Sequence, residues 1–276
     1  MLSFEFFPPR TDSARDLLEK TVQVLAELSP DFMTVTYGAG GTSRDLTFDI
    51  VRSLQTRTAI PMASHLTCIV TPKQDIMDIA DYLWAHDIHH IVALRGDAPA
   101  DMALPVAGDP AYYAVSSDLV RGLLARHPFE ISVAAYPEKH PEAPSLMADI
   151  EALRQKFDAG AKRAITQFFF NNESFYRFRD IFGTQEDRPV RVGILPITNF
   201  AKTCEFAGKC GTSIPDWLHE RFAKAGDHLE SQKDIAFDVL CEQIIDLRQN
   251  GVESFHFYTL NQSDMIYRAC KTLSLA

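Results

Sequence analysis

Short apolar runs alternate with longer amphipathic stretches along the whole chain, and this alternation constrains the fold more than any other feature. Each run has roughly the length of a buried strand, and each connection is long enough for a helix. The pattern predicts eight strands, at Leu2–Phe7, Phe32–Thr36, Pro61–Cys68, Ile88–Leu94, Phe129–Ala135, Arg163–Phe168, Val190–Leu195 and Ser254–Tyr258. Helices are predicted around Ser13–Glu27, Arg44–Thr56, Pro72–Ala85, a stretch ending near Arg126, Ser145–Ala159, Asn172–Phe182, Asn199–Ala207, Asp234–Gln249 and a last stretch to about Leu273.

Eight strand–helix units in 276 residues fit a closed barrel. We therefore predict a single (β/α)8 TIM barrel as one catalytic domain over residues 1–276, with no regulatory domain. An extra helix is expected between Gly211 and Lys233, before the eighth unit, and the third helix is expected to use Thr71 as its N-cap with Pro72 at its first position. The alternative is an open doubly wound sheet, which would leave two strand edges unpaired.

Composition limits the kinds of molecule that this chain is expected to bind. A net charge of −10 argues against nucleic acid or an anionic membrane as the main partner, although a local basic patch can still bind an anionic ligand. No apolar run reaches the roughly 18 residues of a membrane span, and the first residues lack a signal-peptide pattern. The five cysteines are scattered without CxxC spacing, as is typical of free thiols in a reducing cytoplasm. We expect a cytoplasmic protein.

Polar residues gather where the predicted strands end. In the fourth strand the apolar run from Ile91 to Leu94 breaks into Arg95-Gly96-Asp97, where the glycine permits a sharp turn. Other strands carry or end in polar residues as well, at Thr36, His65, Tyr136 to His140, Gln167 and Tyr258 to Asn261. Ligands of α/β barrels bind beyond the carboxyl ends of the strands. The sequence thus predicts one site assembled from many loops.

Glu5 is the strongest single candidate for a catalytic residue. Strand alternation places it on the same side as Ser3 and Phe7, away from Phe4 and Phe6. If that side faces the barrel interior, loss of hydration should raise the pKa of Glu5 and make it a proton donor near neutral pH. The alternative is a structural glutamate paired with a lysine or arginine near the barrel mouth.

Other features give weaker signals. The run Gly38–Ser43 opens a helix, where backbone N–H groups can meet an anion, but it matches no nucleotide-binding motif and a tight turn explains it. His86, His89 and His90 lie at a helix end and a strand start, so we predict solvated or capping histidines and no metal. Taken alone, three residues have ordinary explanations as a cap, a surface charge and a core residue: Asp97, Lys156 and Phe206.

Several motifs, taken together and in order, resemble one known family. The segments Ser3–Arg10, Val35–Ala39, His65–Cys68, Ala93–Asp97, Ala135–Glu138, Ala164–Phe170 and His256–Asn261 are similar to those of methylenetetrahydrofolate reductases of the short bacterial type. The resemblance implies a (β/α)8 flavoprotein that binds FAD and takes a hydride from NADH or NADPH. It passes the hydride to 5,10-methylenetetrahydrofolate, and the product, 5-methyltetrahydrofolate, supplies methyl groups for methionine synthesis. Family members are commonly homo-oligomers.

The resemblance also implies roles for individual residues. Glu5 resembles the catalytic acid that assists opening of the methylene bridge, and Asp97 resembles the aspartate beside flavin and folate, where it favours the developing iminium charge. The FAD pattern maps to Thr36, His65, Leu94, Arg95, Gly96, Asp97, Tyr136, His140, Asp149 and Lys156. Arg95 and Lys156 would face the pyrophosphate. The folate contacts map to Glu5, Gln167, Phe206 and Tyr258.

The sequence departs from the family pattern in places. Lys202 and Gln262 stand where a glutamine and an arginine are expected among the folate contacts; Gln262 removes a charge that could meet the glutamate tail, and Lys202 adds one. The segment Tyr113–Asp118 is longer than usual, which leaves open the residue that contacts FAD there. Control by S-adenosylmethionine is not expected.

Three questions stay open at this point. The first is whether the electron donor is NADH or NADPH. The second is whether electrons come instead from a partner protein. The third is whether the barrel is a non-catalytic subunit that serves only binding or assembly, which the presence of Glu5 and Asp97 argues against.

Overall fold

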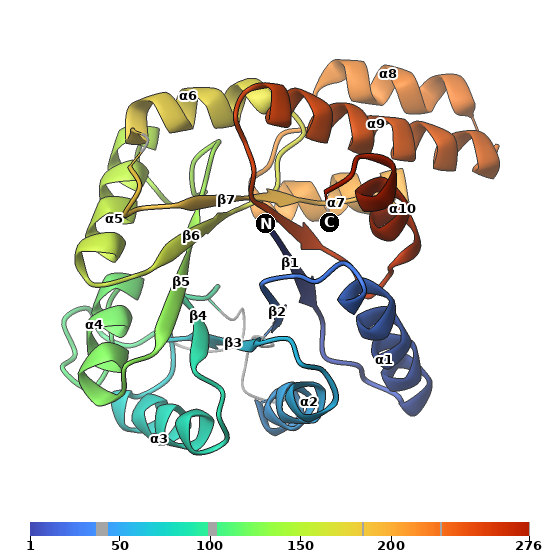
Figure 1. The fold of residues 1–276 in the computed structure, drawn as a ribbon. Helices are drawn as coiled ribbons and strands as arrows, with labels where there is room; N and C mark the ends of the chain where they lie inside the picture. The colour runs from blue at the N-terminus through green and yellow to red at the C-terminus, as the bar shows by residue number, and fades with distance from the viewer. Residues whose placement is uncertain (37–43, 99–103, 184, 227, 276) are drawn as a thin grey trace.

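A computed structural model describes residues 1–36, 44–98, 104–183, 185–226 and 228–275. Within them, parallel strands β1 to β8 follow one another around a closed barrel, and β1 pairs with β8 (Figure 1). Closure leaves no strand edge, so the predicted (β/α)8 TIM barrel is confirmed and the open sheet is excluded. The strands are β1 (Leu2–Phe6), β2 (Phe32–Val35), β3 (Met62–Thr67), β4 (His90–Leu94), β5 (Glu130–Ala135), β6 (Arg163–Thr166), β7 (Val190–Ile194) and β8 (Phe255–Tyr258).

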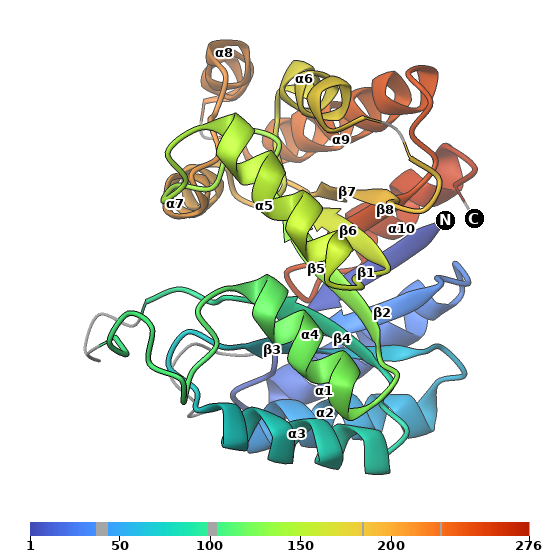
Figure 2. The same cartoon turned by 90° about the vertical axis from the view of Figure 1, so that its left-hand side faces the viewer.

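Helices surround the barrel on its outside (Figures 1 and 2). They are α1 (Asp12–Ala26), α2 (Arg44–Arg57), α3 (Lys73–Ala85), α4 (Ser116–Arg126), α5 (Leu146–Asp158), α6 (Asn172–Phe182), α7 (Phe200–Cys210), α8 (Asp216–Ala225), α9 (Leu229–Gln249) and α10 (Asp264–Thr272). The inserted helix expected before the eighth unit is α8. No helix among the described residues is both long and apolar enough to cross a membrane.

Helix starts follow local capping chemistry. The side chains of Ser145 and Asn199 accept backbone N–H groups of the first turns of α5 and α7, so the predicted starts of these helices hold to within one residue. The prediction for α3 was wrong by one position: Pro72 is the N-cap and makes no side-chain hydrogen bond, and Thr71 lies outside the helix. The run Gly38–Ser43 lies outside the described residues.

The strands separate two environments by the period-two alternation of their side chains. On β1, Phe4 and Phe6 are fully buried in the core between the strands and the helices. Ser3 and Glu5 lie on one side of β1, as predicted, and that side faces the barrel interior, where Ser3 pairs in register with His256 of β8 and Glu5 with Tyr258. The alternation thus places an acidic side chain inside the barrel.

The barrel interior mixes apolar and polar side chains. Phe32, Ala63, Val92 and Ile165 form an apolar cluster there, whereas most (β/α)8 barrels fill the interior with branched aliphatic residues. His90 belongs to this interior as well: it is 5% exposed and its Nε2 lies 2.8 Å from Oγ of Ser132. The prediction of a solvated or capping histidine was therefore wrong for His90.

The other two histidines of that group behave as predicted. The Nδ1 atom of His86 lies 2.7 Å from the carbonyl oxygen of Tyr82 at the C-terminal end of α3, so His86 caps that helix. His89 is exposed.

Candidate active site

A cavity of about 820 Å³ opens where the strands end at their carboxyl side. Residues from β1, β3, β4, β5, β6 and β8 line it, together with residues from α3, α4, α5 and α7. The residues predicted to be catalytic or ligand-binding come together here, except Lys202 and Gln262, which are exposed and are not among the described lining residues. Those that line the cavity are Glu5, Thr36, His65, Leu94, Arg95, Gly96, Asp97, Tyr136, His140, Asp149, Lys156, Gln167, Phe206 and Tyr258.

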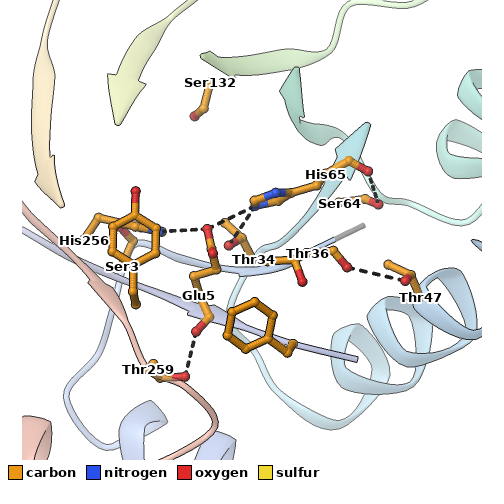
Figure 3. A network of polar contacts seen from close by, with 12 residues as sticks. Ser3, Glu5, Thr34, Thr36, Thr47, Ser64, His65, Ser132, His256 and Thr259 are labelled. Carbon is orange, nitrogen blue, oxygen red and sulfur yellow. Dashed lines mark hydrogen bonds and ion pairs between the residues drawn. The ribbon is translucent and has the colours of Figure 1, made fainter. Parts of the chain in front are cut away.

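Two histidines approach one oxygen of Glu5 (Figure 3). Oε2 of Glu5 lies 3.3 Å from Nε2 of His65 and 3.4 Å from Nε2 of His256. Behind them, Oγ of Ser3 lies 2.8 Å from Nδ1 of His256, and Oγ1 of Thr34 lies 3.3 Å from Nε2 of His65. Because these residues belong to β1, β2, β3 and β8, closure of the barrel is what brings them together.

The histidines reverse the predicted shift of the Glu5 pKa. Burial raises this pKa, as expected from the sequence, but the charge of His65 and the hydrogen bonds from His256 and His65 outweigh burial and lower it to about 2. The raised pKa predicted for Glu5 was therefore wrong for the ligand-free protein. Here the carboxyl group is ionised, so Glu5 must take up a proton before it can donate one.

Asp97 follows β4 on an exposed turn that depends on Gly96. Gly96 has φ +88°, and a Cβ there would lie 2.9 Å from Cβ of Thr67, so only glycine fits without strain. Burial raises the pKa of the Cys210 thiol to about 11, and the charges of Asp97 and Glu5 add to this effect. The charges of Asp97 and Glu5 thus both reach Cys210, so the two carboxylates lie at the same end of the barrel.

Two cations line the cavity. Lys156 is buried on α5; its ammonium donates to the carbonyl oxygen of Ala134 at 2.8 Å, and burial lowers its pKa to about 8 although Asp149 opposes the shift. Arg95 forms an ion pair with the exposed Glu142. The carboxylate of Asp149 accepts the backbone N–H of His140 at 2.7 Å, which ties the loop after β5 to α5. The cavity wall thus holds two cations, each with a carboxylate beside it.

Aromatic rings form another part of the wall. Phe206 is 37% exposed and stacks on Phe168, with ring centroids 5.4 Å apart and an interplanar angle of 16°. The hydroxyl of Tyr258 donates to the carbonyl oxygen of Thr166 at 2.7 Å, which fixes its ring. A Cβ on Gly193 would lie 2.1 Å from that same carbonyl oxygen, so glycine is needed for β7 to pass this point.

Sequence reasoning named His65 as a site residue but not as a partner of Glu5, and it only partly resolved the loop after β4. Ser3 and Thr34 were not predicted as site residues, and His256 was only part of a motif, because the register that closes the barrel assembles them. In the loop, Val115, Ser116 and Ser117 line the cavity, whereas Tyr113 packs against Gly122 of α4. Among the described residues, no group of three or more histidines, cysteines or carboxylates could hold a metal ion.

The fold and the site define a class: a (β/α)8-barrel protein with one ligand cavity at the carboxyl ends of its strands, lined by carboxylates, cations and aromatic rings. The sequence profile of the methylenetetrahydrofolate reductase family matches residues 1–274. The chain belongs to the methylenetetrahydrofolate reductase family, and this membership supports methylenetetrahydrofolate reductase activity.

Curated relatives are similar over nearly the whole chain. The 5,10-methylenetetrahydrofolate reductase of Escherichia coli (strain K12) is 44% identical over 275 residues, which cover 99% of this chain and 90% of that protein. The enzyme of the same name from Pectobacterium carotovorum is 42% identical with the same coverage. A rice protein named probable methylenetetrahydrofolate reductase (NADH) is 33% identical over 95% of this chain and 46% of its own length.

Solved structures share the fold at low sequence identity. A Clostridium thermocellum protein described as binding two copies of 5-methyl-5,6,7,8-tetrahydrofolic acid aligns with a TM-score of 0.65 and 16% identity, over 100% of this chain and 93% of that one. Dihydropteroate synthase from Xanthomonas albilineans aligns with a TM-score of 0.53 and 11% identity, over 99% of this chain and 91% of that one. At these identities the likeness concerns the fold alone.

Proposed function

We propose that this chain reduces 5,10-methylenetetrahydrofolate to 5-methyltetrahydrofolate, with FAD as its redox cofactor and NADH or NADPH as the electron donor. The observation that carries the proposal is that Glu5 of β1 and Asp97 after β4 line one cavity, beside two cations and a stacked aromatic pair. The name of the rice relative, which specifies NADH, supports a nicotinamide donor. The product would supply methyl groups for methionine synthesis, and we expect a homo-oligomer in the cytoplasm.

The residues of the cavity fit a flavin dinucleotide. Its volume of about 820 Å³ lies in the upper part of the range usual for small-molecule sites. An ammonium has three donors, and Lys156 uses one of them among the described residues, so the others can meet a pyrophosphate. Gly96 lines the cavity, and its positive φ shapes the turn that carries Asp97 to the same cavity. FAD, when bound, supplies the hydride transfer from the nicotinamide to the folate.

The protein's own side chains supply charge and protons. Asp97 would place negative charge beside the folate, where it stabilises the iminium cation that forms when the methylene bridge opens. Glu5 would deliver the proton that the folate N10 takes up in that step. Phe206 would offer its exposed face for stacking of the pterin or nicotinamide ring, and Gln167 would offer its amide for hydrogen bonds to the pterin.

Arg95 has a competing partner. In the described structure its guanidinium is paired with Glu142, whose pKa is lowered by this hydrogen bond. The pair is partly exposed, so the interaction is weak in water and a pyrophosphate can displace or share it. FAD binding would therefore rearrange the loop around Glu142 rather than fill a cationic site that is free beforehand.

An anaerobic half-reaction experiment tests the proposal. The purified protein, loaded with FAD, is mixed with NADH or NADPH, and the yellow flavin absorbance is followed. Methylenetetrahydrofolate is then added. We expect bleaching by at least one nicotinamide and return of the absorbance with folate.

The other outcomes separate the alternatives. A flavin that binds but is bleached only by a protein donor would support a partner protein as the electron source. Failure to bind FAD, or a bleached flavin that folate does not reoxidise, would overturn the proposed function and favour the non-catalytic subunit.

A further inference from the structure

Of the two histidines that contact Glu5, one borders the cavity and the other does not. His65 lines the cavity, and its side chain is 8% exposed, whereas His256 is fully buried and does not line it. Both approach the same carboxylate oxygen of Glu5. The two histidines therefore differ in access, because of the two only His65 borders the cavity in which a ligand would bind.

Ser3 fixes the state of His256. If the Ser3 hydroxyl donates to Nδ1 of His256, across their 2.8 Å contact, the neutral imidazole carries its hydrogen on Nε2, where it faces the Glu5 carboxylate. The opposite tautomer would turn a lone pair toward an ionised carboxylate. Burial lowers the pKa of His256, and the charge of Arg191 adds to this effect against the pull of Glu5. His256 is thus a neutral, fixed donor.

The remaining titratable groups around Glu5 keep their protons. The pKa of Tyr258 is raised by burial and by the charge of Glu5, and the pKa of Cys210 is raised by the same two causes and by Asp97. Thr34 is not titratable. Glu5 and His65 are therefore the pair of contacting titratable groups that borders the cavity.

We propose that the catalytic proton is held jointly by Glu5 and His65, and that Ser3 and His256 are positioning residues that keep the Glu5 carboxylate in place for its transfer. This proposal rests on the proposed function. In the open, ligand-free cavity Glu5 is ionised, and Nε2 of His65 lies 3.3 Å from its Oε2, within reach for a proton transfer. When flat ligand rings cover the cavity and exclude water, the ion pair loses hydration, and the neutral pair of carboxylic acid and imidazole becomes favoured. Ligand binding thus moves the proton to Glu5.

The transfer balances in atoms and charge. The bond between the methylene carbon and N10 of the folate breaks, its electron pair stays on N10, and N10 takes the proton from the carboxyl group of Glu5. This leaves an iminium cation at N5 and an ionised Glu5. The hydride supplied through the nicotinamide then joins the methylene carbon. After the product leaves, His65 takes a proton from water through the cavity.

An infrared titration of the Glu5 carboxyl group tests the proposal in the free protein. The carboxylic-acid band is assigned by its loss in Glu5→Gln. In the wild type we expect this band to be absent at neutral pH. In His65→Gln, which removes the charge but keeps a donor, we expect the band at neutral pH, because the effect of burial is then no longer outweighed. His86→Gln, in the α3 cap, is the matched control and should leave the band absent.

A second measurement follows the flavin-loaded protein on addition of 5-methyltetrahydrofolate. The Glu5 band should appear in the wild type as the cavity is covered. Ser3→Ala, which does not line the cavity, should slow folate-dependent reoxidation by about tenfold and shift its pH profile, with flavin reduction by the nicotinamide unchanged. A merely structural Ser3 would affect both half-reactions or neither.

Three results would overturn the proposal. They are a Glu5 titration unchanged by His65→Gln, no Glu5 band on addition of 5-methyltetrahydrofolate, and an unaltered pH profile in Ser3→Ala. Failure of the proposed function is distinguishable, because the wild type would then not reoxidise with folate while the free-protein titration still reports on the Glu5–His65 pair.

Discussion

The two ends of the barrel interior are both polar, but they are built differently. At the amino end, Arg191 of β7 pairs with Asp31 at 2.7 Å, and Arg163 of β6 pairs with Glu130. Both guanidinium groups lie over the ring of Phe32, at 4.9 and 5.1 Å from its centroid. Each of these two guanidinium groups therefore has a carboxylate beside it, and the ring of Phe32 lies against both.

At the carboxyl end the polar groups face an open volume instead. Glu5, His65 and Asp97 border a cavity of about 820 Å³, and Glu5 has histidines rather than permanent cations as its partners. Buried polarity by itself therefore does not mark a site in this barrel. What distinguishes the site is a group that can change its protonation and that faces space for a ligand.

The largest expected effect lies at the carboxyl end. We expect Glu5→Gln to slow folate-dependent reoxidation of the flavin by roughly 100- to 10,000-fold, because the proposed general acid is lost, while reduction by the nicotinamide stays within a few-fold. Stopped-flow absorbance measures both half-reactions separately. Equal losses in the two half-reactions would mean that Glu5 shapes the cavity rather than donating a proton.

The next effect concerns the cation in the wall. Lys156→Met should weaken FAD binding by roughly 10- to 100-fold, the range for a hydrogen bond to a charged group. Because the pKa of Lys156 is lowered to about 8, the wild type should bind the anionic dinucleotide more weakly as the pH rises through that value. The variant should lack this pH dependence. Fluorescence titration of FAD across pH checks both points, and a retained pH dependence would assign it to another group.

Asp31→Asn tests whether the ion pairs at the amino end of the barrel serve stability rather than catalysis. The guanidinium of Arg191 is 6% exposed, and removal of its charged partner should lower the free energy of unfolding by about 1–3 kcal/mol. Both half-reactions should remain within about twofold of the wild type, since no ligand reaches this end. Urea unfolding measures the first quantity and stopped-flow absorbance the second. Glu19→Gln, in the exposed pair with Arg57, is the control and should change stability by less than about 1 kcal/mol. A catalytic defect in Asp31→Asn would show that the amino end of the barrel also affects catalysis.

The sequence predicted the features that depend on local order. Strand and helix periodicity is local, and so is the alternation that placed Glu5 inside and Phe4 outside, because side chains alternate along any strand. The same alternation, counted back from Leu94 through Val92, would have placed His90 in the interior rather than in solvent.

The direction of the Glu5 pKa shift could not be predicted in this way. It depends on His65 and on His256, which lies 251 positions away and meets Glu5 only through the register between β1 and β8. The burial of Glu5 follows from its place on the strand, whereas the histidine contacts that lower its pKa exist only in the closed barrel. Sequence reasoning therefore named Glu5 and His65 as site residues but not the contacts with His65 and His256 that set the protonation of Glu5.

The smallest expected effect lies at the rim. Lys202 is exposed near the start of α7, one helical turn before Phe206, so both residues lie on the same face of that helix. If its ammonium meets the glutamate tail of the folate, Lys202→Gln should raise the KM for a polyglutamylated folate by about two- to fivefold, as for an exposed ion pair, and leave the monoglutamate nearly unaffected. The difference should shrink at high salt, because exposed charges are screened. Steady-state kinetics with both folates at two ionic strengths measures this. An equal rise for both substrates would place Lys202 against the pterin and extend the cavity wall beyond Phe206.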